Sequence, residues 1–316
     1  MNPVVLVVGG PDGYRAVADD WGAVGLDLDL RAGPDFAHVL TGGALAYGDP
    51  LPGPGTDEDV QAGALLDPDR RVLLLFTLEG PTARMRTRRA ALALLRAAWP
   101  GWDVRWAHGG RTQLRAYAGL DPADDPQRNV LPWDGNLFDA GSAGWVVPDA
   151  DVTVVTVDTP GRCHLVCHAF DHPVMHGPAL LGLLDAVTDH GTYHEPVAAG
   201  LHIDPERRRV GWWLTGHQVH HDTAAARWPG WTVEFWEDRW AEHRAASGGR
   251  FDPTEPDGTA ALADVRDEAL RHWSPVRHEP DGSDLLSRTG GASREIPHGE
   301  AARRVVGAAY RAAGGG

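Results

Sequence analysis

Apolar segments separated by turn residues follow one another along roughly the first 120 positions, and the same succession returns after position 150. Residues 4–8 and 14–18 are rich in valine and alanine and flank the run Gly-Gly-Pro-Asp-Gly, which is typical of a hairpin turn. Residues 152–157 and 163–169 flank the run Asp-Thr-Pro-Gly in the same way. The pattern therefore predicts two β-hairpins, one at the start of each succession.

A second pair of strands is predicted after each hairpin. The run Asp-Pro-Asp/Glu-Arg begins at Asp67 and again at Asp204, which places Asp and Pro in the first two positions of a type I turn. The predicted strands on either side of these turns are residues 64–66, 72–77, 201–203 and 210–215.

Apolar residues at helical spacing predict several helices between and after these strands. Pro34 and Pro178 each suit the first turn of a helix, and residues 83–98 carry Leu92 and Leu95 on one face of a longer helix. The remaining predicted helices are short and lie at 112–118, near 219–227 and at 237–246.

The strongest sign of a duplication is the tetrapeptide Trp-Pro-Gly-Trp, which occurs at 99–102 and again at 228–231. Proline pushes the preceding tryptophan out of the helical region and glycine relieves the turn, so each tetrapeptide predicts a corner that leads into a strand. The hairpins, the Gly-Pro pairs, the Asp-Pro turns and the Trp corners come in the same order in both copies.

We therefore predict an α+β fold, a tandem duplication of a ββαββαβα-like unit with mostly antiparallel sheets and helices on one face. The first repeat unit spans residues 1–120, a linker rich in Asp, Pro and Gly spans 121–150, and the second repeat unit spans 151–248. Residues 249–316 have no counterpart in the first copy. They are predicted to form a polar, partly disordered tail with a helix over 259–273.

Charge narrows the range of partners. The chain has 44 acidic and 29 basic residues, all of the latter arginine, and a net charge of −15. Such a surface repels nucleic-acid backbones and favours encounter with a basic protein. The absence of lysine excludes Schiff-base catalysis and argues against phosphate binding of the Walker type. No cofactor is predicted.

The expected environment is the bacterial cytoplasm. No apolar run approaches the roughly 20 residues of a membrane span, and the first residues lack the basic region of a secretory signal. Cys163 and Cys167 are the only cysteines, which excludes a disulfide framework and suits a reducing compartment. Abundant Ala, Gly and Arg with only two isoleucines indicates a GC-rich genome.

Candidate metal ligands gather in the second copy, in residue types that bind zinc or copper. The first cluster is Cys163, His164, Cys167 and His168. Residues four apart on a strand are about 13 Å from each other, too far to ligate one ion, so ordinary core positions are the alternative. His217 and His221 have helical i,i+4 spacing but lack the Glu of a zinc-protease motif, so a solvated helix start is the alternative for them.

The 13 tryptophans give a second group of candidates. In the strand after each tetrapeptide, alternate positions are aromatic or valine, which predicts core packing. Tryptophan is also enriched at interfaces, and the candidates for binding are Trp212, Trp213, Trp236 and Trp240. No serine lies in a nucleophile elbow and no dinucleotide motif is present, so no catalytic residue is predicted.

The order of these motifs resembles that of uncharacterised actinobacterial proteins with duplicated Trp-Pro-Gly-Trp units, over about residues 1–246. In its acidity and its α/β pattern the chain is also similar to immunity proteins of toxin systems, an analogy of fold and charge. We expect a non-catalytic partner-binding protein, with neutralisation of a basic toxin as its specific form. An enzyme or metal-binding protein with its site in the second repeat unit is the alternative, and a scaffold is the third hypothesis.

Overall fold

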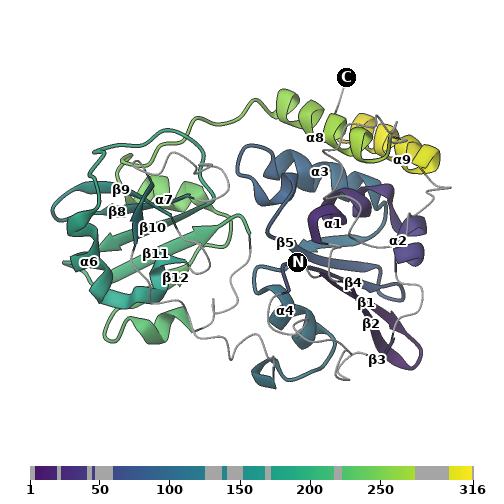
Figure 1. Ribbon diagram of the computed structural model, residues 1–316, viewed down its shortest axis with the longest axis horizontal. Coiled ribbons are helices and arrows are strands. Elements are labelled where there is room, and N and C mark those ends of the chain that lie inside the picture. Colours follow the sequence, from purple (N-terminus) through teal and green to yellow (C-terminus); the bar gives the residue numbers. More distant parts are fainter. Residues whose placement is uncertain are drawn as a thin grey trace, which may run out of the picture. The chain divides into compact units, whose positions relative to one another are not determined.

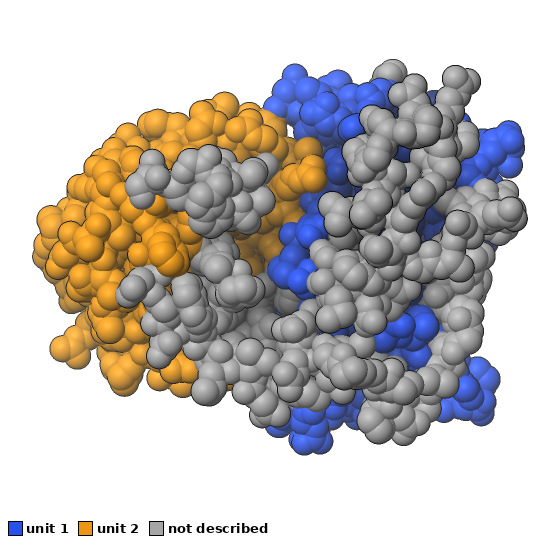
Figure 2. All heavy atoms as spheres, in the orientation of Figure 1, with its two compact units in different colours: residues 1–82, 89–127, 257–316 blue, residues 83–88, 128–256 orange. Residues whose placement is uncertain are grey.

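Two six-stranded sheets form the framework of the computed structural model, which describes residues 4–19, 23–40, 45–46, 60–124, 137–140, 152–167, 172–216, 223–274 and 299–314. Each sheet lies in its own unit (Figures 1 and 2). Unit 1 comprises Met1–Thr82, Arg89–Gln127 and Asp257–Gly316, and unit 2 comprises Ala83–Arg88 and Arg128–Pro256.

The sheet of unit 1 has the strand order β3-β2-β1-β4-β5-β6. Its strands are β1 (Val4–Gly10), β2 (Gly13–Asp19), β3 (Leu45–Ala46), β4 (Ala62–Asp67), β5 (Val72–Thr77) and β6 (Asp103–Trp106). β1 is parallel to β4 and β5 is parallel to β6, and the other neighbours are antiparallel.

The sheet of unit 2 has the strand order β12-β11-β10-β8-β9-β7. Its strands are β7 (Phe138–Asp139), β8 (Val152–Val157), β9 (Arg162–Cys167), β10 (Ala199–Asp204), β11 (Arg209–Leu214) and β12 (Thr232–Phe235). β8 is parallel to β10 and β11 is parallel to β12, and the other neighbours are antiparallel.

The two sheets repeat one arrangement. In order and direction, β1, β2, β4, β5 and β6 correspond to β8, β9, β10, β11 and β12. The predicted α+β fold and its tandem duplication are thus confirmed. The edge strands β3 and β7 do not correspond, because β3 follows β2 in the chain whereas β7 precedes β8. β7 also lies within residues 121–150, for which the sequence predicts a linker.

Helices and 3-10 turns connect the strands. Those that lie wholly or partly in unit 1 are α1 (Ala23–Asp29), η1 (Leu30–Ala32), α2 (Pro34–Leu40), η2 (Pro81–Ala83), α3 (Arg88–Ala98), α4 (Gly110–Tyr117), η3 (Pro122–Asp124), α8 (Gly258–His272) and α9 (Gly299–Ala312). Those of unit 2 are η6 (Pro173–Ala179), α6 (Leu180–Leu183), η7 (Leu184–Ala186), η8 (Ala224–Arg227) and α7 (Trp240–Ala246). The long helix predicted from position 83 begins at Arg88, after a hydrogen-bonded turn in which Thr87 N donates to Arg84 O at 3.2 Å.

Both faces of the central strands are covered. Every residue of β4 and β5 is buried, and so is every residue of β10. In unit 1, α1 and α3 lie on one side of the sheet and α4 lies on the other (Figure 1). The sequence pattern predicts helices on one face, whereas continuous burial requires a layer on each side.

The Trp corners have the same structure in both units. Nε1 of Trp99 donates to the carbonyl of Leu30 at 2.6 Å, and Nε1 of Trp228 donates to the carbonyl of Val174 at 2.7 Å. The glycine of each tetrapeptide has a φ of 78°, which an L side chain rarely adopts. Each corner is therefore a buried anchor, in which the indole satisfies a carbonyl of a 3-10 helix far upstream in the chain, η1 in unit 1 and η6 in unit 2.

Of the residues predicted to be a polar tail, 257–316 belong to unit 1 and carry α8 and α9, and 249–256 belong to unit 2. Trp273, just after α8, is buried, packs edge-on against Phe36 at 4.7 Å and donates from Nε1 to the carbonyl of Leu28 at 3.3 Å. Val306 of α9 lies in the same apolar cluster. The apolar faces of the two helices thus add to the core of unit 1, which a reading based on the first copy could not show.

Among the described helices, none is both long enough and apolar enough to cross a membrane.

Candidate functional site

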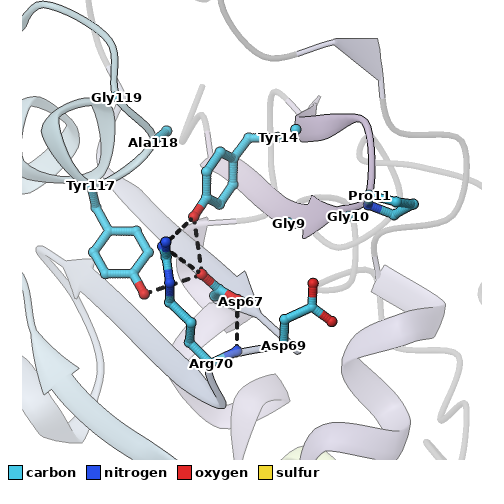
Figure 3. A pocket seen from close by; sticks show the side chains of 11 residues that line it. Gly9, Gly10, Pro11, Tyr14, Asp67, Asp69, Arg70, Tyr117, Ala118 and Gly119 are labelled. Atoms are coloured by element: carbon cyan, nitrogen blue, oxygen red, sulfur yellow. Dashed lines mark hydrogen bonds and ion pairs between the residues drawn. The ribbon is translucent and has the colours of Figure 1, made fainter.

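A pocket of about 600 Å³ opens in unit 1 where three turns meet (Figure 3). The turns are the β1–β2 connection, the β4–β5 connection and the end of α4. The residues that line the pocket are Gly9, Gly10, Pro11, Gly13, Tyr14, Asp67, Asp69, Arg70, Tyr117, Ala118 and Gly119. The pocket therefore lies at the carboxyl ends of the parallel strands β1 and β4, a common place for a ligand.

Asp67 is positioned by the turn that the sequence predicts. The backbone N of Arg70 donates to Oδ1 of Asp67 at 3.0 Å, which closes the turn. The same turn recurs in unit 2, where the backbone N of Arg207 donates to Oδ1 of Asp204 at 2.9 Å. This part of the site is a folding feature that both copies share.

Two tyrosines complete the site, and unit 2 has no tyrosine at the corresponding positions. Tyr14 of β2 and Tyr117 of α4 point at Asp67 from two sides (Figure 3). Their hydroxyls donate to Oδ2 of Asp67 at 3.0 and 3.2 Å, and Nη1 of Arg70 donates to the same oxygen at 3.3 Å. The rings of the tyrosines meet edge-on with centroids 6.3 Å apart.

The hydrogen bonds fix the protonation of the site. Burial by itself would raise the pKa of the Asp67 carboxyl, but the bonds from Arg70 N, Tyr14 and Tyr117 hold this pKa below its usual value. Burial and the bond to Asp67 raise the pKa of Tyr14 to about 12, and burial raises the pKa of Tyr117. Near pH 7, Asp67 is therefore an anion and both phenols keep their protons.

Arg70 closes the network toward solvent. Its side chain is 68% exposed, its Nη1 donates to the Tyr14 hydroxyl at 3.4 Å, and its guanidinium lies 5.9 Å from the centre of the Tyr117 ring. Exposed pairs of this kind contribute little to stability. Arg70 therefore shapes the rim of the pocket more than it stabilises the fold.

Glycine keeps the wall of the pocket open. Gly9, Gly10, Gly13 and Gly119 present backbone alone, and Gly13 and Gly119 have φ values of 101° and 80°. The wall is thus free of side chains at these four positions.

A second polar network lies in the core of unit 2. Nε1 of Trp213 donates to Nδ1 of His243 at 3.0 Å, and Oγ1 of Thr156 lies 2.7 Å from Nε2 of His243 and 2.9 Å from Nδ1 of His202. Nε2 of His202 lies 3.5 Å from Oδ2 of Asp158. An indole nitrogen can only donate, so every member is satisfied when protons point in one direction, from Trp213 to Asp158.

Burial keeps this network neutral. It lowers the pKa of His243 well below the usual value and also lowers the pKa of His202. Thr156 is fully buried, and none of these residues lines the unit 1 pocket. We therefore interpret the network as a structural, hydrogen-bonded part of the core of unit 2.

The tryptophans predicted to bind a partner are core residues. Trp212 and Trp213 are fully buried, and Trp236 and Trp240 are 6% and 2% exposed. Trp212 packs against Phe235, and the other three belong to one apolar cluster. A binding role for these rings stays a prediction that would require the core of unit 2 to open.

Three candidate metal ligands of the first cluster lie within the described part of the chain. Cys163, His164 and Cys167 are buried in β9, and His168 lies outside the described residues. Nδ1 of His164 lies 3.1 Å from the carbonyl of Thr188. Within the described ranges, no three His, Cys, Asp or Glu residues are grouped closely enough to hold a metal ion. His217 and His221 also lie outside the described residues.

The sequence pattern does not point to Tyr14, Tyr117 or Arg70 as site residues, and it indicates Asp67 only as a turn residue. A signal was available, because the Asp-Pro turn occurs in both copies while the tyrosines occur in one. Their convergence on Asp67 depends on α4, whose place beside β4 is a tertiary feature.

No protein family, curated protein or solved structure matches this chain.

Proposed function

We propose that this protein binds a protein partner without catalysis, and that the unit 1 pocket is the point of contact. The observation that carries the proposal is the fixed network at the base of the pocket. Asp67 receives hydrogen bonds from Tyr14, Tyr117 and Arg70, so the polar groups are ordered before any ligand arrives. Such preorganisation reduces the entropic cost of binding.

The protonation states of the site favour binding over acid–base chemistry. A general acid or base works best with a pKa near the working pH. The pKa of Asp67 lies below its usual value and that of Tyr14 is about 12, so neither group exchanges protons readily near pH 7. This supports a site that recognises a ligand and leaves it unchanged.

Charge favours a basic partner. Two carboxylates, Asp67 and Asp69, and one guanidinium, Arg70, line the pocket, and the whole chain carries a net charge of −15. Opposite charge accelerates encounter between proteins. Asp69 is exposed at the rim, where a partner would first meet the pocket.

A matched pair of charge reversals tests the proposal. Asp69→Arg alters the pocket rim, whereas Glu206→Arg makes a similar change at the corresponding exposed turn position of unit 2. We expect the wild-type protein and Glu206→Arg to retain the same partner from a lysate of the native host, and Asp69→Arg to lose it. The purified partner should then bind at least about 10-fold more weakly to Asp69→Arg in calorimetry. Equal affinity for both variants would refute the role of the pocket.

Neutralisation of a basic toxin is the specific form of this proposal that the analogy suggests. Its test is growth rescue. Co-expression of the chain with a basic toxin encoded beside it should restore growth, and the Asp69→Arg variant should fail to do so.

A further inference from the structure

The unit 1 pocket has a counterpart in unit 2 that is already occupied. Val8 pairs with Arg15 and Leu66, and Val157 pairs with Arg162 and Ile203 in the same register. Gly9, which follows Val8, therefore corresponds to Asp158, and Tyr14, which precedes Arg15, corresponds to Gly161.

The ends of α4 and α7 correspond as well. The backbone N of Ala118 donates to the carbonyl of Leu114, and that of Ser247 donates to the carbonyl of His243. Gly119 and Gly248 follow with positive φ values of 80° and 62°. By this alignment, Asp121 in unit 1 occupies the chain position of Arg250 in unit 2.

In unit 2 the guanidinium of Arg250 fills this corner. Its Nη1 donates to Oδ1 of Asp158 at 3.1 Å and to the carbonyl of Ser247 at 2.9 Å. A Cβ placed on Gly161 would lie 2.5 Å from Nη2 of Arg250. The Arg250 side chain is thus held between the hairpin turn and the end of α7, and it remains 29% exposed.

In unit 1 the same two elements bound an open pocket. The position that supplies the arginine in unit 2 is Asp121, whose carboxylate accepts from the backbone N of Ala123 at 2.8 Å. Gly9 and Ala118, the counterparts of the residues that hold Arg250, both line the pocket. The corner itself differs between the units: Gly9 takes the place of Asp158, and the side chain of Tyr14 extends from the position where Gly161 leaves room for Arg250. The open space of unit 1 therefore lies beside the Tyr14 ring, with Asp67 and Asp69 as its carboxylates.

The polar groups of the open pocket suit a ligand that only donates. Both phenol protons are committed to Asp67, so the oxygens of Tyr14 and Tyr117 can only accept further hydrogen bonds, and that of Tyr14 already accepts one from Arg70. Asp69 adds a carboxylate, and the tyrosine rings offer faces to a cation. A guanidinium has five N–H donors and no acceptor, which matches this set.

Arg70 does not exclude a second guanidinium. Its counterpart Arg207 makes the same ion pair, with Nη1 2.9 Å from Oδ2 of Asp204. Unit 2 holds Arg250 in addition to this pair through Asp158. In unit 1, where Gly9 stands at that position, Asp69 is the carboxylate available to a second guanidinium. The pairing of Arg70 with Asp67 is therefore compatible with another arginine in the neighbouring corner.

We infer that the unit 1 pocket binds a guanidinium group, and that in the complex this group is an arginine side chain of the partner protein. The inference rests on the proposed function and specifies which chemical group of the partner enters the pocket.

Small probes test the chemistry directly. Capped arginine, N-acetyl-L-arginine N-methylamide, is titrated into the full chain by NMR or calorimetry, beside the corresponding lysine and citrulline compounds. We expect saturable binding of the arginine compound and at least about 10-fold weaker binding of the other two. The reason is that lysine lacks the planar donor set and citrulline lacks the charge. Free L-arginine separates the two sources of a guanidinium. A 10-fold preference for the free amino acid would overturn the assignment to a partner's side chain.

A substitution that fills the corner provides an independent test. Asp121→Arg restores the residue that unit 2 has at this position and should reduce binding of capped arginine at least about 10-fold. Asp124→Arg makes the same charge change on a nearby exposed residue and should leave binding within about 2-fold. Equal weakening by both would show that only overall charge matters and would overturn the inference.

These outcomes separate the inference from the proposed function. If no arginine compound binds while the host partner is still lost on Asp69→Arg, the guanidinium assignment fails and the partner-binding function stands. If the partner is indifferent to Asp69→Arg while capped arginine binds, the pocket recognises a guanidinium from another source, and both the role of the pocket in partner binding and the assignment to a partner's side chain fail.

Discussion

Nε1 of Trp213 donates to Nδ1 of His243 at 3.0 Å in the core of unit 2, and this contact determines which nitrogen of the histidine carries its proton. The other nitrogen then donates to Thr156, whose hydroxyl donates in turn to His202. A proton added to either ring would leave a buried donor without an acceptor. The network is therefore built for neutral histidines.

Acid is expected to destabilise the protein through these rings. Their folded pKa values lie below the unfolded value of about 6.5, so the unfolded chain binds more protons as the pH falls. The stability that the neutral rings provide is complete above about pH 6.5 and is lost progressively below it. Each ring can contribute a slope of up to about 1.4 kcal/mol per pH unit. Urea unfolding at a series of pH values between about 8 and 5 measures this slope.

Unit 1 supplies the control for this experiment, because its counterparts of four of the five network residues, all but Asp158, are apolar. They are Val7, Leu65, Phe76 and Leu114. The combined variant Thr156→Val, His202→Leu, Trp213→Phe and His243→Leu should stay folded. The number of protons that it takes up on unfolding in acid should be lower by up to two. An unchanged slope would rule out the network as its cause.

The two Asp turns should respond differently to the same substitution. Asp204→Asn disturbs a turn and an ion pair with an arginine whose side chain is 72% exposed, which is worth little. Asp67→Asn also removes the charged acceptor of Tyr14 and Tyr117. We expect Asp67→Asn to cost about 1–3 kcal/mol more in the free energy of unfolding, measured by urea titration. Equal costs would mean that the tyrosine bonds contribute nothing to stability.

Trp273 should be essential to the packing of residues 257–316. Its ring is 2% exposed and lies edge-on to Phe36, so Trp273→Ala should lower the free energy of unfolding by about 3–5 kcal/mol. Hydrogen exchange should speed up in α8 and α9 at the same time. Leu78→Ala, at a side chain that is 48% exposed, serves as the control and should change stability by less than about 0.5 kcal/mol. If residues 257–316 contributed nothing to the core, the two variants would have similar free energies of unfolding.

The two cysteines should be unreactive in the folded protein. Both are buried, and burial raises the pKa of Cys163 to about 12, so its reactive thiolate is scarce. A disulfide-exchange reagent should label neither thiol until the chain is unfolded. The metal site predicted from the sequence remains open to the same assay. If a chelator accelerated labelling and released stoichiometric zinc, burial would not be the cause, and the metal-binding alternative would take the place of our interpretation.

The duplicated fold could be predicted because its signals are local. The Asp-Pro turns at Asp67 and Asp204 and the Trp-Pro-Gly-Trp corners depend on backbone preferences of adjacent residues, so they read directly from the chain. The packing of residues 257–316 could not be predicted in this way. The apolar faces of α8 and α9 become core only because the cluster around Leu28 and Trp273 receives them.

The candidate site was decided by tertiary structure. Tyr14 and Tyr117 are 103 positions apart in the sequence and converge on Asp67 only because β2 and α4 pack at the same end of one sheet. The sequence by itself determined that the unit occurs twice, since turn and corner chemistry is local. Only the folded chain decided that Arg250 lies over Gly161 in one copy while Tyr14 takes that place and borders a pocket in the other, since side chains distant in sequence compete for that space.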